Sequence, residues 1–270
     1  MDHWLQQCRE AAIDFLEQSG WLRHVEWFNE IDSTNTHARR QLADGFQRWP
    51  ALWVADKQTA GRGRTTRQWW SPEGCLMLSL VIGQEHVPND SALWPQLSLV
   101  VGVAAANAVE IEVPQVAVKL KWPNDLFVHD RKLAGILVEA VPRAVDGRVA
   151  FIVGIGLNVA IDWSQADNAL QARACSLSQF ADREIILETV LIRLVEQLRE
   201  WMLSWKSGDP AWWEQWSERS LLTGRTVELR LPTSDRLVGE CAGIDSSGQL
   251  LIRNAGMCHR IQSADVVAWR

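Results

Sequence analysis

Apolar residues recur at helical spacing in several parts of the chain, and this pattern predicts the main helices. The segment 4–18 carries an apolar stripe, and Ser33 or Asp32 is placed to cap a second helix. The Ala-rich segment 94–109 and the segment 185–205 are also predicted to be helical. The stripe of the last helix is typical of a face that packs on a protein core.

Short apolar runs bounded by turn residues predict strands between these helices, and Asp130-Arg131 separates two of the runs as a hairpin turn would. Beyond Gly224, short alternating runs replace the helices and predict a small C-terminal β-barrel. We therefore expect two domains, 1–220 and 221–270. The predicted strands are 52–55, 75–82, 116–121, 126–129, 133–141 and 149–159, followed by 227–231, 237–239, 250–252 and 266–267.

Composition narrows the class of protein. Hydrophobic residues make up 47% and charged residues 22%, which excludes a disordered or fibrous chain. No apolar run approaches the ~18 residues of a membrane span, and charged residues interrupt the segment 1–20, so we expect a cytoplasmic protein with no membrane partner. The net charge of −6 argues against a surface that coats nucleic acid.

Cysteine and histidine point to no metal or disulfide chemistry. The 5 cysteines show no C-x-x-C and are expected to be reduced thiols, and the 6 histidines lack metal-binding spacing. With no tyrosine, the chain cannot use a phenol as a catalytic acid. Lysine is rare beside arginine, and most of the lysines lie in or near two segments that carry chemistry, namely Lys57, Lys119, Lys121 and Lys132.

The first of these segments is the loop 61–67, G-R-G-R-T-T-R. Its glycines let backbone N–H groups approach a ligand, and its arginines offer planar forks for phosphate or carboxylate. The segment lacks G-K-[ST] and is not a P-loop. It predicts a site for a discrete anion such as a nucleotide, although a solvated basic loop has the same composition.

The second segment is the turn at 121–125, K-W-P-N-D, with Lys132 brought back by the predicted hairpin. A lysine and an aspartate placed together there could share one site, where an ammonium neutralises a carboxylate and an α-phosphate as they react. An ordinary charged turn is the alternative. Two further motifs give weaker signals. G-x-G-x-N at 154–158 is typical of a strand that a ligand approaches closely or of a β-bulge, and S-T-N at 33–35 is typical of a helix N-cap.

In combination, these motifs closely resemble those of the biotin protein ligases. They stand in the family order as S-T-N at 33–35, Q-x-x-G-R-G-R at 58–64, K-W-P-N-D at 121–125, K-L-A-G-I-L-V-E at 132–139 and G-x-G-x-N at 154–158. The resemblance covers about residues 25–270. It implies an α+β fold, with a mixed β-sheet flanked by helices and a small C-terminal SH3-like barrel.

The resemblance also implies a two-step reaction. Biotin and MgATP would give biotinyl-5′-AMP and pyrophosphate, and biotin would then pass to a lysine of the biotin carboxyl carrier protein or domain of acetyl-CoA carboxylase. By motif match, the catalytic residues would be Lys132, Arg64 and Asp125. The biotin-binding set would be Ser33, Thr34, Asn35, Gln58, Arg62, Gly63, Arg64, Lys132, Gly135, Gly154 and Gly156. The ATP-binding set would be Arg64, Arg67, Lys121, Asn124 and Asn158, with Mg²⁺ brought in by ATP and no certain metal site of the protein itself.

Two departures from the family pattern matter. Thr66 stands where many members have glycine, which would stiffen the loop. Only residues 1–32 precede Ser33, too few for the DNA-binding domain of some members, so we expect no DNA partner. A lipoate or octanoate ligase of the same superfamily and a non-catalytic biotin-binding regulator remain alternatives, as do a monomer and a homodimer.

Overall fold

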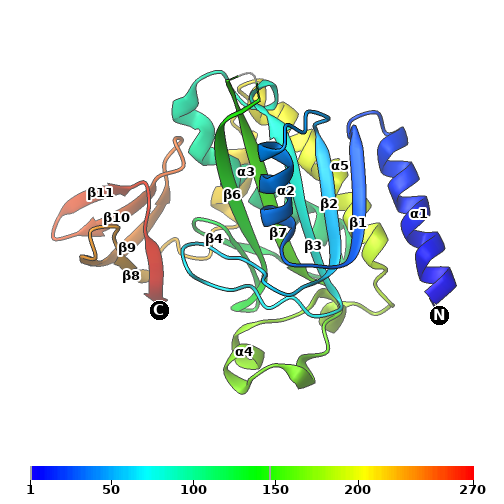
Figure 1. The fold of residues 1–270 in the computed structure, drawn as a ribbon. Coiled ribbons are helices and arrows are strands. Elements are labelled where there is room, and N and C mark those ends of the chain that lie inside the picture. Colours follow the sequence, from blue (N-terminus) through cyan, green and yellow to red (C-terminus); the bar gives the residue numbers. More distant parts are fainter. Residues whose placement is uncertain (1, 146) are drawn as a thin grey trace.

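Seven strands form the central sheet in the order β1-β2-β3-β7-β6-β5-β4 (Figure 1). The pair β1–β2 is parallel, and the other neighbouring pairs are antiparallel. The computed structural model describes residues 2–145 and 147–270. The strands of this sheet are β1 (His24–Ile31), β2 (Ala51–Gln58), β3 (Cys75–Gly83), β4 (Lys119–Lys121), β5 (Asp125–Val128), β6 (Arg131–Val145) and β7 (Arg148–Asn158).

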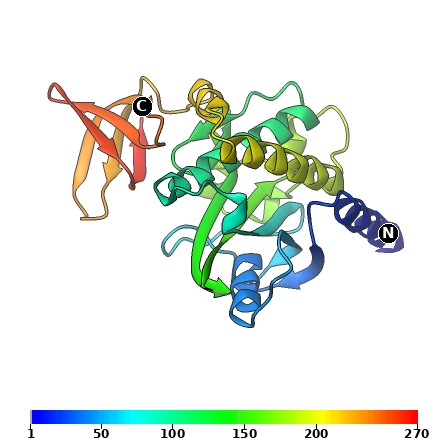
Figure 2. The same cartoon turned by 90° about the horizontal axis from the view of Figure 1, so that it is seen from above.

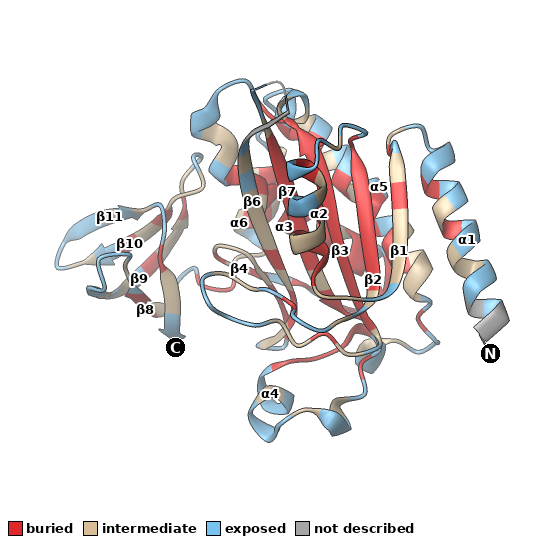
Figure 3. Cartoon of the chain, viewed as in Figure 1, coloured by how far each residue is buried: buried red, intermediate tan, exposed pale blue. Residues whose placement is uncertain are grey.

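Helices cover both faces of this sheet (Figure 2). The helices α3 (Leu97–Glu112) and α5 (Leu187–Lys206) pack together on one face, and α2 (Thr34–Ala43) lies on the other. Because both faces are covered, every residue of β3 is buried, which explains why this strand is apolar except at Ser79 (Figure 3). The remaining helices are α1 (Asp2–Gln18), beside β1 and α5, then α4 (Asn168–Arg173) and α6 (Ala211–Glu218).

The C-terminal residues form a five-stranded antiparallel sheet in the order β11-β10-β9-β8-β12. Trp122 Nε1 donates to the Gly248 carbonyl at 3.1 Å, and Gln96 Nε2 donates to the Ser246 carbonyl at 3.1 Å. The turn between β9 and β10 therefore holds this sheet against the part of the chain that carries the central sheet. Its strands are β8 (Thr226–Arg230), β9 (Arg236–Ile244), β10 (Leu250–Asn254), β11 (Met257–Ile261) and β12 (Asp265–Trp269).

The expected fold, a mixed sheet with flanking helices and a C-terminal β-module, is confirmed, but some boundaries were wrong. The strand predicted at 116–121 begins only at Lys119, because the Val118 N–H bonds the Glu110 carboxylate instead of a neighbouring strand. The helix predicted from Trp94 starts as a 3₁₀ segment, Ser91–Gln96, and becomes α-helical at Leu97. The strands β1 and β11 were not predicted at all.

The expectation that no apolar run is long enough for a membrane span was wrong for the segment Ser91–Glu112. It is 22 residues long, its most apolar window has a mean hydropathy of 1.5, and it is long and apolar enough to cross a membrane by length and composition alone. However, 67% of its most apolar window is buried inside the structure, where α3 packs between the sheet, α5 and α6. A helix that is apolar on all sides is also what a protein core requires.

Candidate active site

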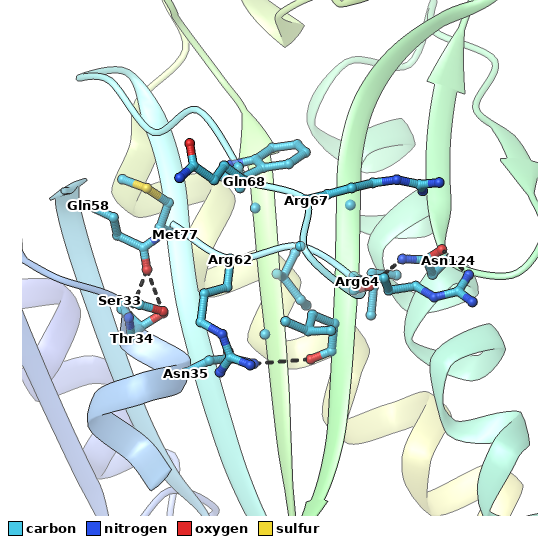
Figure 4. Close-up of a pocket in the computed structure, with 18 of the residues that line it drawn as sticks. Ser33, Thr34, Asn35, Gln58, Arg62, Arg64, Arg67, Gln68, Met77 and Asn124 are labelled. Carbon is cyan, nitrogen blue, oxygen red and sulfur yellow. Dashed lines mark hydrogen bonds between the residues drawn. The ribbon is translucent and has the colours of Figure 1, made fainter. Parts of the chain in front are cut away.

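A cavity opens on the α2 face of the central sheet, between the N-terminus of that helix and the loop 61–67 (Figure 4). It spans about 710 Å³, including the open space at its mouth. Of the predicted site residues, all except Lys121 and Asn158 line it. The lining consists of Ser33, Thr34, Asn35, Gln58, Arg62, Gly63, Arg64, Arg67, Asn124, Asp125, Lys132, Gly135, Gly154 and Gly156, together with Gln68, Trp69, Met77, Leu78, Ile136, Leu137 and Ile155.

The N-terminus of α2 supplies a polar end of the cavity. Ser33 caps the helix as predicted, since its hydroxyl accepts from the Thr36 N–H at 3.4 Å. Gln58, the last residue of β2, accepts from the Thr34 N–H at 2.8 Å and from Thr34 Oγ1 at 3.1 Å (Figure 4). The Gln58 Nε2 in turn donates to Ser71 Oγ at 3.2 Å. Donors and acceptors from two distant segments are thus held side by side.

Asn35 is buried beneath this polar end, and its side-chain amide is hydrogen-bonded to other residues of the chain. Ser79 Oγ donates to Asn35 Oδ1 at 2.6 Å, and Asn35 Nδ2 donates to Glu139 Oε2 at 2.9 Å and to the Leu137 carbonyl at 3.4 Å. A Cβ on Gly154 would lie 2.1 Å from Asn35 Oδ1, so only glycine lets the amide rest on the sheet. These contacts give Asn35 the role of holding α2 in place beside the cavity.

The indole of Trp69 forms a wall of the cavity and lies over two further glycines, Gly135 and Gly156. Gly135 and Gly156 are register partners on β6 and β7, and the ladder is regular around them, so the bulge considered for this motif is absent there. A Cβ on Gly156 would lie 2.5 Å from the Trp69 ring, and one on Gly135 would lie 3.1 Å from it. The close approach that the glycines permit in this structure is therefore that of a tryptophan side chain.

The loop 61–67 crosses the mouth of the cavity. The Gly63 N–H donates to the Arg67 carbonyl at 2.8 Å and closes a turn. The positive φ of this turn, 57°, falls on Thr65, so Thr66 occupies ordinary backbone and the missing glycine causes no strain there. The three arginines reach different elements: Arg62 pairs with Glu139 at 3.2 Å, Arg64 donates to Asn124 Oδ1 and to the Ala264 carbonyl at 3.4 Å each, and Arg67 pairs with Asp265 at 3.1 Å.

Lys132 and Asp125 form an ion pair at the cavity, with 2.7 Å between Nζ and Oδ1. Asp125 opens β5 and Lys132 lies near the start of β6. The predicted hairpin between them is confirmed, with positive φ at His129 and Asp130. The two side chains are 32% and 17% exposed, respectively, so water screens the pair only partly. The hairpin thus presents a fixed ammonium to the cavity, as a site for two reacting anions requires.

Two predicted ATP-binding residues lie outside the cavity lining. The Lys121 ammonium lies 4.6 Å from the centre of the Trp269 ring, and burial lowers the pKa of Lys121 to about 8. Asn158 is buried, and its Nδ2 donates to the carbonyls of Cys175 at 3.0 Å and Lys132 at 3.4 Å. Asn158 therefore supports the backbone that carries Lys132, and a contact of either residue with ATP stays a prediction.

The sequence did not predict Trp69, which lines the cavity, or Ser79 and Glu139, which bond the lining residue Asn35. Trp69 is one of 16 tryptophans, and nothing in the sequence separates it from those of the core. Ser79 offered a signal, because it is the one polar residue within the apolar run of β3. Strand alternation places it on the same face as Met77, which lines the cavity. Glu139 stood inside a quoted motif but received no role.

The chain has relatives among known proteins. Residues 27–158 match the model of the biotin/lipoate A/B protein ligase family. The biotin–[acetyl-CoA-carboxylase] ligase of Mycobacterium tuberculosis is 31% identical over 254 residues, covering 93% of this chain and 91% of that protein. The enzyme of the same name from Paracoccus denitrificans is 31% identical over 242 residues, covering 87% and 96%.

A solved structure shows the same fold. The biotin protein ligase from Aquifex aeolicus in complex with biotin and ATP has a TM-score of 0.77 and 26% identity, covering 92% of this chain and 99% of that one. These sequence matches and this solved structure show that the chain belongs to the biotin protein ligase family, among the biotin–[acetyl-CoA-carboxylase] ligases.

Proposed function

We propose that this chain activates biotin with ATP and then transfers it to a lysine of the biotin carboxyl carrier protein or domain of acetyl-CoA carboxylase. One observation carries the proposal: a single cavity combines the hydrogen-bonding groups of Thr34 and Gln58 with the cations Lys132 and Arg64. The polar groups suit the ureido ring of biotin, and the cations suit its carboxylate and the phosphates of ATP.

In the first step, a carboxylate oxygen of biotin attacks the α-phosphorus of ATP. A C–O–P linkage forms, the bond to the β-phosphate oxygen breaks, and pyrophosphate leaves. Both reactants are anions, so cations at the reacting centre lower the barrier. Lys132 supplies one such charge, held in place by Asp125, and Arg64, fixed against Asn124, supplies another.

Magnesium enters this proposal as part of the substrate MgATP. Asn124 and Asp125 offer oxygen atoms near the cations, but Asn124 Oδ1 already accepts from Arg64, and Asp125 is paired with Lys132. Within residues 2–145 and 147–270, no group of three or more His, Cys, Asp or Glu side chains is arranged to hold a metal. These residues do not fit a resident ion, and no step here depends on one.

In the second step, the amine of the carrier lysine attacks the acyl carbon of biotinyl-5′-AMP. An amide bond forms, the C–O bond to AMP breaks, and the amine gives up its proton. Asp125 is the carboxylate at the reacting end of the cavity and is our candidate acceptor for a hydrogen bond from that amine. We place the reaction in the cytoplasm, which suits the 5 free cysteines, Cys8, Cys75, Cys175, Cys241 and Cys258.

The polar end favours biotin over lipoate. The ureido N–H and carbonyl groups of biotin can exchange hydrogen bonds with Thr34 and Gln58, which otherwise bond each other and Ser71, whereas the dithiolane ring of lipoate offers neither group. The test is a competition with MgATP, biotin and lipoate, in which each acyl adenylate is quantified by mass spectrometry. We expect biotinyl-AMP to dominate. Preferential formation of lipoyl-AMP would overturn the substrate assignment, and binding of biotin without any adenylate would indicate a regulator.

A further inference from the structure

Glu139 is a carboxylate at the edge of the cavity for which the proposed reaction has no use. It lies on β6 two residues beyond Leu137, which lines the cavity, so both side chains are on the α2 face of the sheet. Its side chain is 13% exposed. It accepts hydrogen bonds from Asn35 Nδ2 at 2.9 Å and Arg39 NH2 at 2.7 Å, both on α2, and from Arg62 NH1 and NH2 at 3.3 and 3.2 Å.

We infer that Glu139 is a positioning residue that anchors the loop 61–67 through Arg62 and so places this guanidinium at the biotin end of the cavity. Arg62 meets both carboxylate oxygens, a two-point contact that fixes direction as well as distance. In Figure 4 its side chain leaves the loop toward Asn35, at the polar end. The part that concerns biotin rests on the proposed function, whereas the anchoring of the loop does not.

Charge explains why the anchor acts on the loop. Two guanidinium groups, those of Arg39 and Arg62, share one carboxylate, so the loss of its charge would leave two cations facing each other. Desolvation alone would raise the pKa of Glu139, but hydrogen bonds from Asn35 and Arg39 outweigh it and hold that pKa below its ordinary value. The carboxylate is therefore ionised at neutral pH.

The helix and the loop would respond differently to that loss. Asn35 keeps α2 on the sheet through Ser79 and the Leu137 carbonyl, neither of which depends on Glu139. The other two arginines of the loop reach elsewhere: Arg64 contacts Asn124 and the Ala264 carbonyl, and Arg67 pairs with Asp265 of the C-terminal sheet. Loss of the negative charge at Glu139 would therefore release Arg62 and the loop while leaving α2 in place.

The test compares Glu139→Gln, which keeps size and removes charge, with the matched control Glu112→Gln. Glu112 is also a buried carboxylate paired with an arginine, Arg183, but it lies at the end of α3, away from the cavity. Limited trypsin digestion reports opening of the arginine-rich loop in the free protein. We expect cleavage within 61–67 to be about tenfold faster in Glu139→Gln and unchanged in Glu112→Gln.

A second measurement asks whether Glu139 acts through Arg62. Biotin dissociation constants from equilibrium dialysis should rise about tenfold in Glu139→Gln, and no further when the same change is made in an Arg62→Ala background. The inference fails if the loop of Glu139→Gln is cleaved at the wild-type rate. It also fails if Glu139→Gln and Arg62→Ala weaken biotin binding independently and additively. If the wild-type chain binds no biotin, the proposed function fails, while the cleavage comparison still decides whether Glu139 holds the loop.

Discussion

Lys132→Ala is the sharpest perturbation of the proposed chemistry. It removes the ammonium that lies 2.7 Å from Asp125 and leaves that carboxylate, 17% exposed, without its charged partner. The backbone at this position stays in place, because the Lys132 carbonyl accepts from the Cys175 N–H at 3.0 Å whatever the side chain. We therefore expect the fold to survive and the loss to fall on the reaction.

The size of the loss follows from the surroundings of the ammonium. Because the Lys132 side chain is 32% exposed, an effective dielectric constant near 20 applies. At that value, two unit charges about 4 Å apart interact by about 4 kcal/mol. Removal of one preorganised donor from a reacting oxyanion costs about 2.7–4 kcal/mol. At about 1.36 kcal/mol per tenfold, the rate of adenylate formation should fall by about 10²–10³.

The assay is pyrophosphate release with saturating biotin and MgATP, together with biotin binding measured by equilibrium dialysis. Lys119→Ala removes an exposed lysine on β4, two strands away from β6, and is the matched control that should retain wild-type turnover. Biotin affinity of Lys132→Ala should fall by less than the rate does, because only the contact with the biotin carboxylate is lost and Thr34 and Gln58 are untouched. Turnover by Lys132→Ala within about tenfold of wild type would refute the role assigned to this ammonium.

Three further changes extend the test. Gly156→Ala puts a Cβ 2.5 Å from the Trp69 ring, so tryptophan emission should shift and calorimetry should show weaker biotin binding. Burial lowers the pKa of Lys121 from its ordinary 10.5 to about 8, so its side chain loses the positive charge above about pH 8. If this ammonium contacts the phosphates, kcat/KM for ATP should fall above that pH, and Lys121→Arg should abolish the fall. The same lowered pKa affects stability: between about pH 8 and 10.5 only the unfolded chain still holds the Lys121 proton, so the free energy of unfolding should rise with pH over this range. Thermal melts at several pH values check this. Asp265→Asn breaks a pair with Arg67, which is 56% exposed, so the KM for ATP should change by less than about fivefold, and less in high salt.

Local chemistry made much of the site predictable from the sequence. Ser33 followed by a helical pattern predicts a cap, and the turn at Asp130-Arg131 predicts the hairpin that returns Lys132 to Asp125. These features depend on residues close together in the chain, where backbone preferences decide the outcome. The loop 61–67 is predictable for the same reason, because its glycines and arginines are contiguous.

Long-range packing explains what the sequence could not show. Trp69 lies over Gly135 and Gly156, and no local pattern distinguishes such a wall from a core tryptophan. Lys121 and Asn158 matched family motifs, yet the fold turns the first toward Trp269 and buries the second under the backbone of Lys132. Glu139 joins partners about 80 to 100 positions away along the chain, Arg62, Arg39 and Asn35, and so gives no signal in its own neighbourhood.

The central claim is that this cavity activates biotin and hands it to a protein. The most direct measurement incubates the purified chain with MgATP and biotin, follows pyrophosphate, and then weighs an added biotin carboxyl carrier domain by mass spectrometry. The account predicts pyrophosphate release that depends on biotin and a carrier heavier by one biotinyl group. Biotin binding without pyrophosphate and without a change in carrier mass would contradict it.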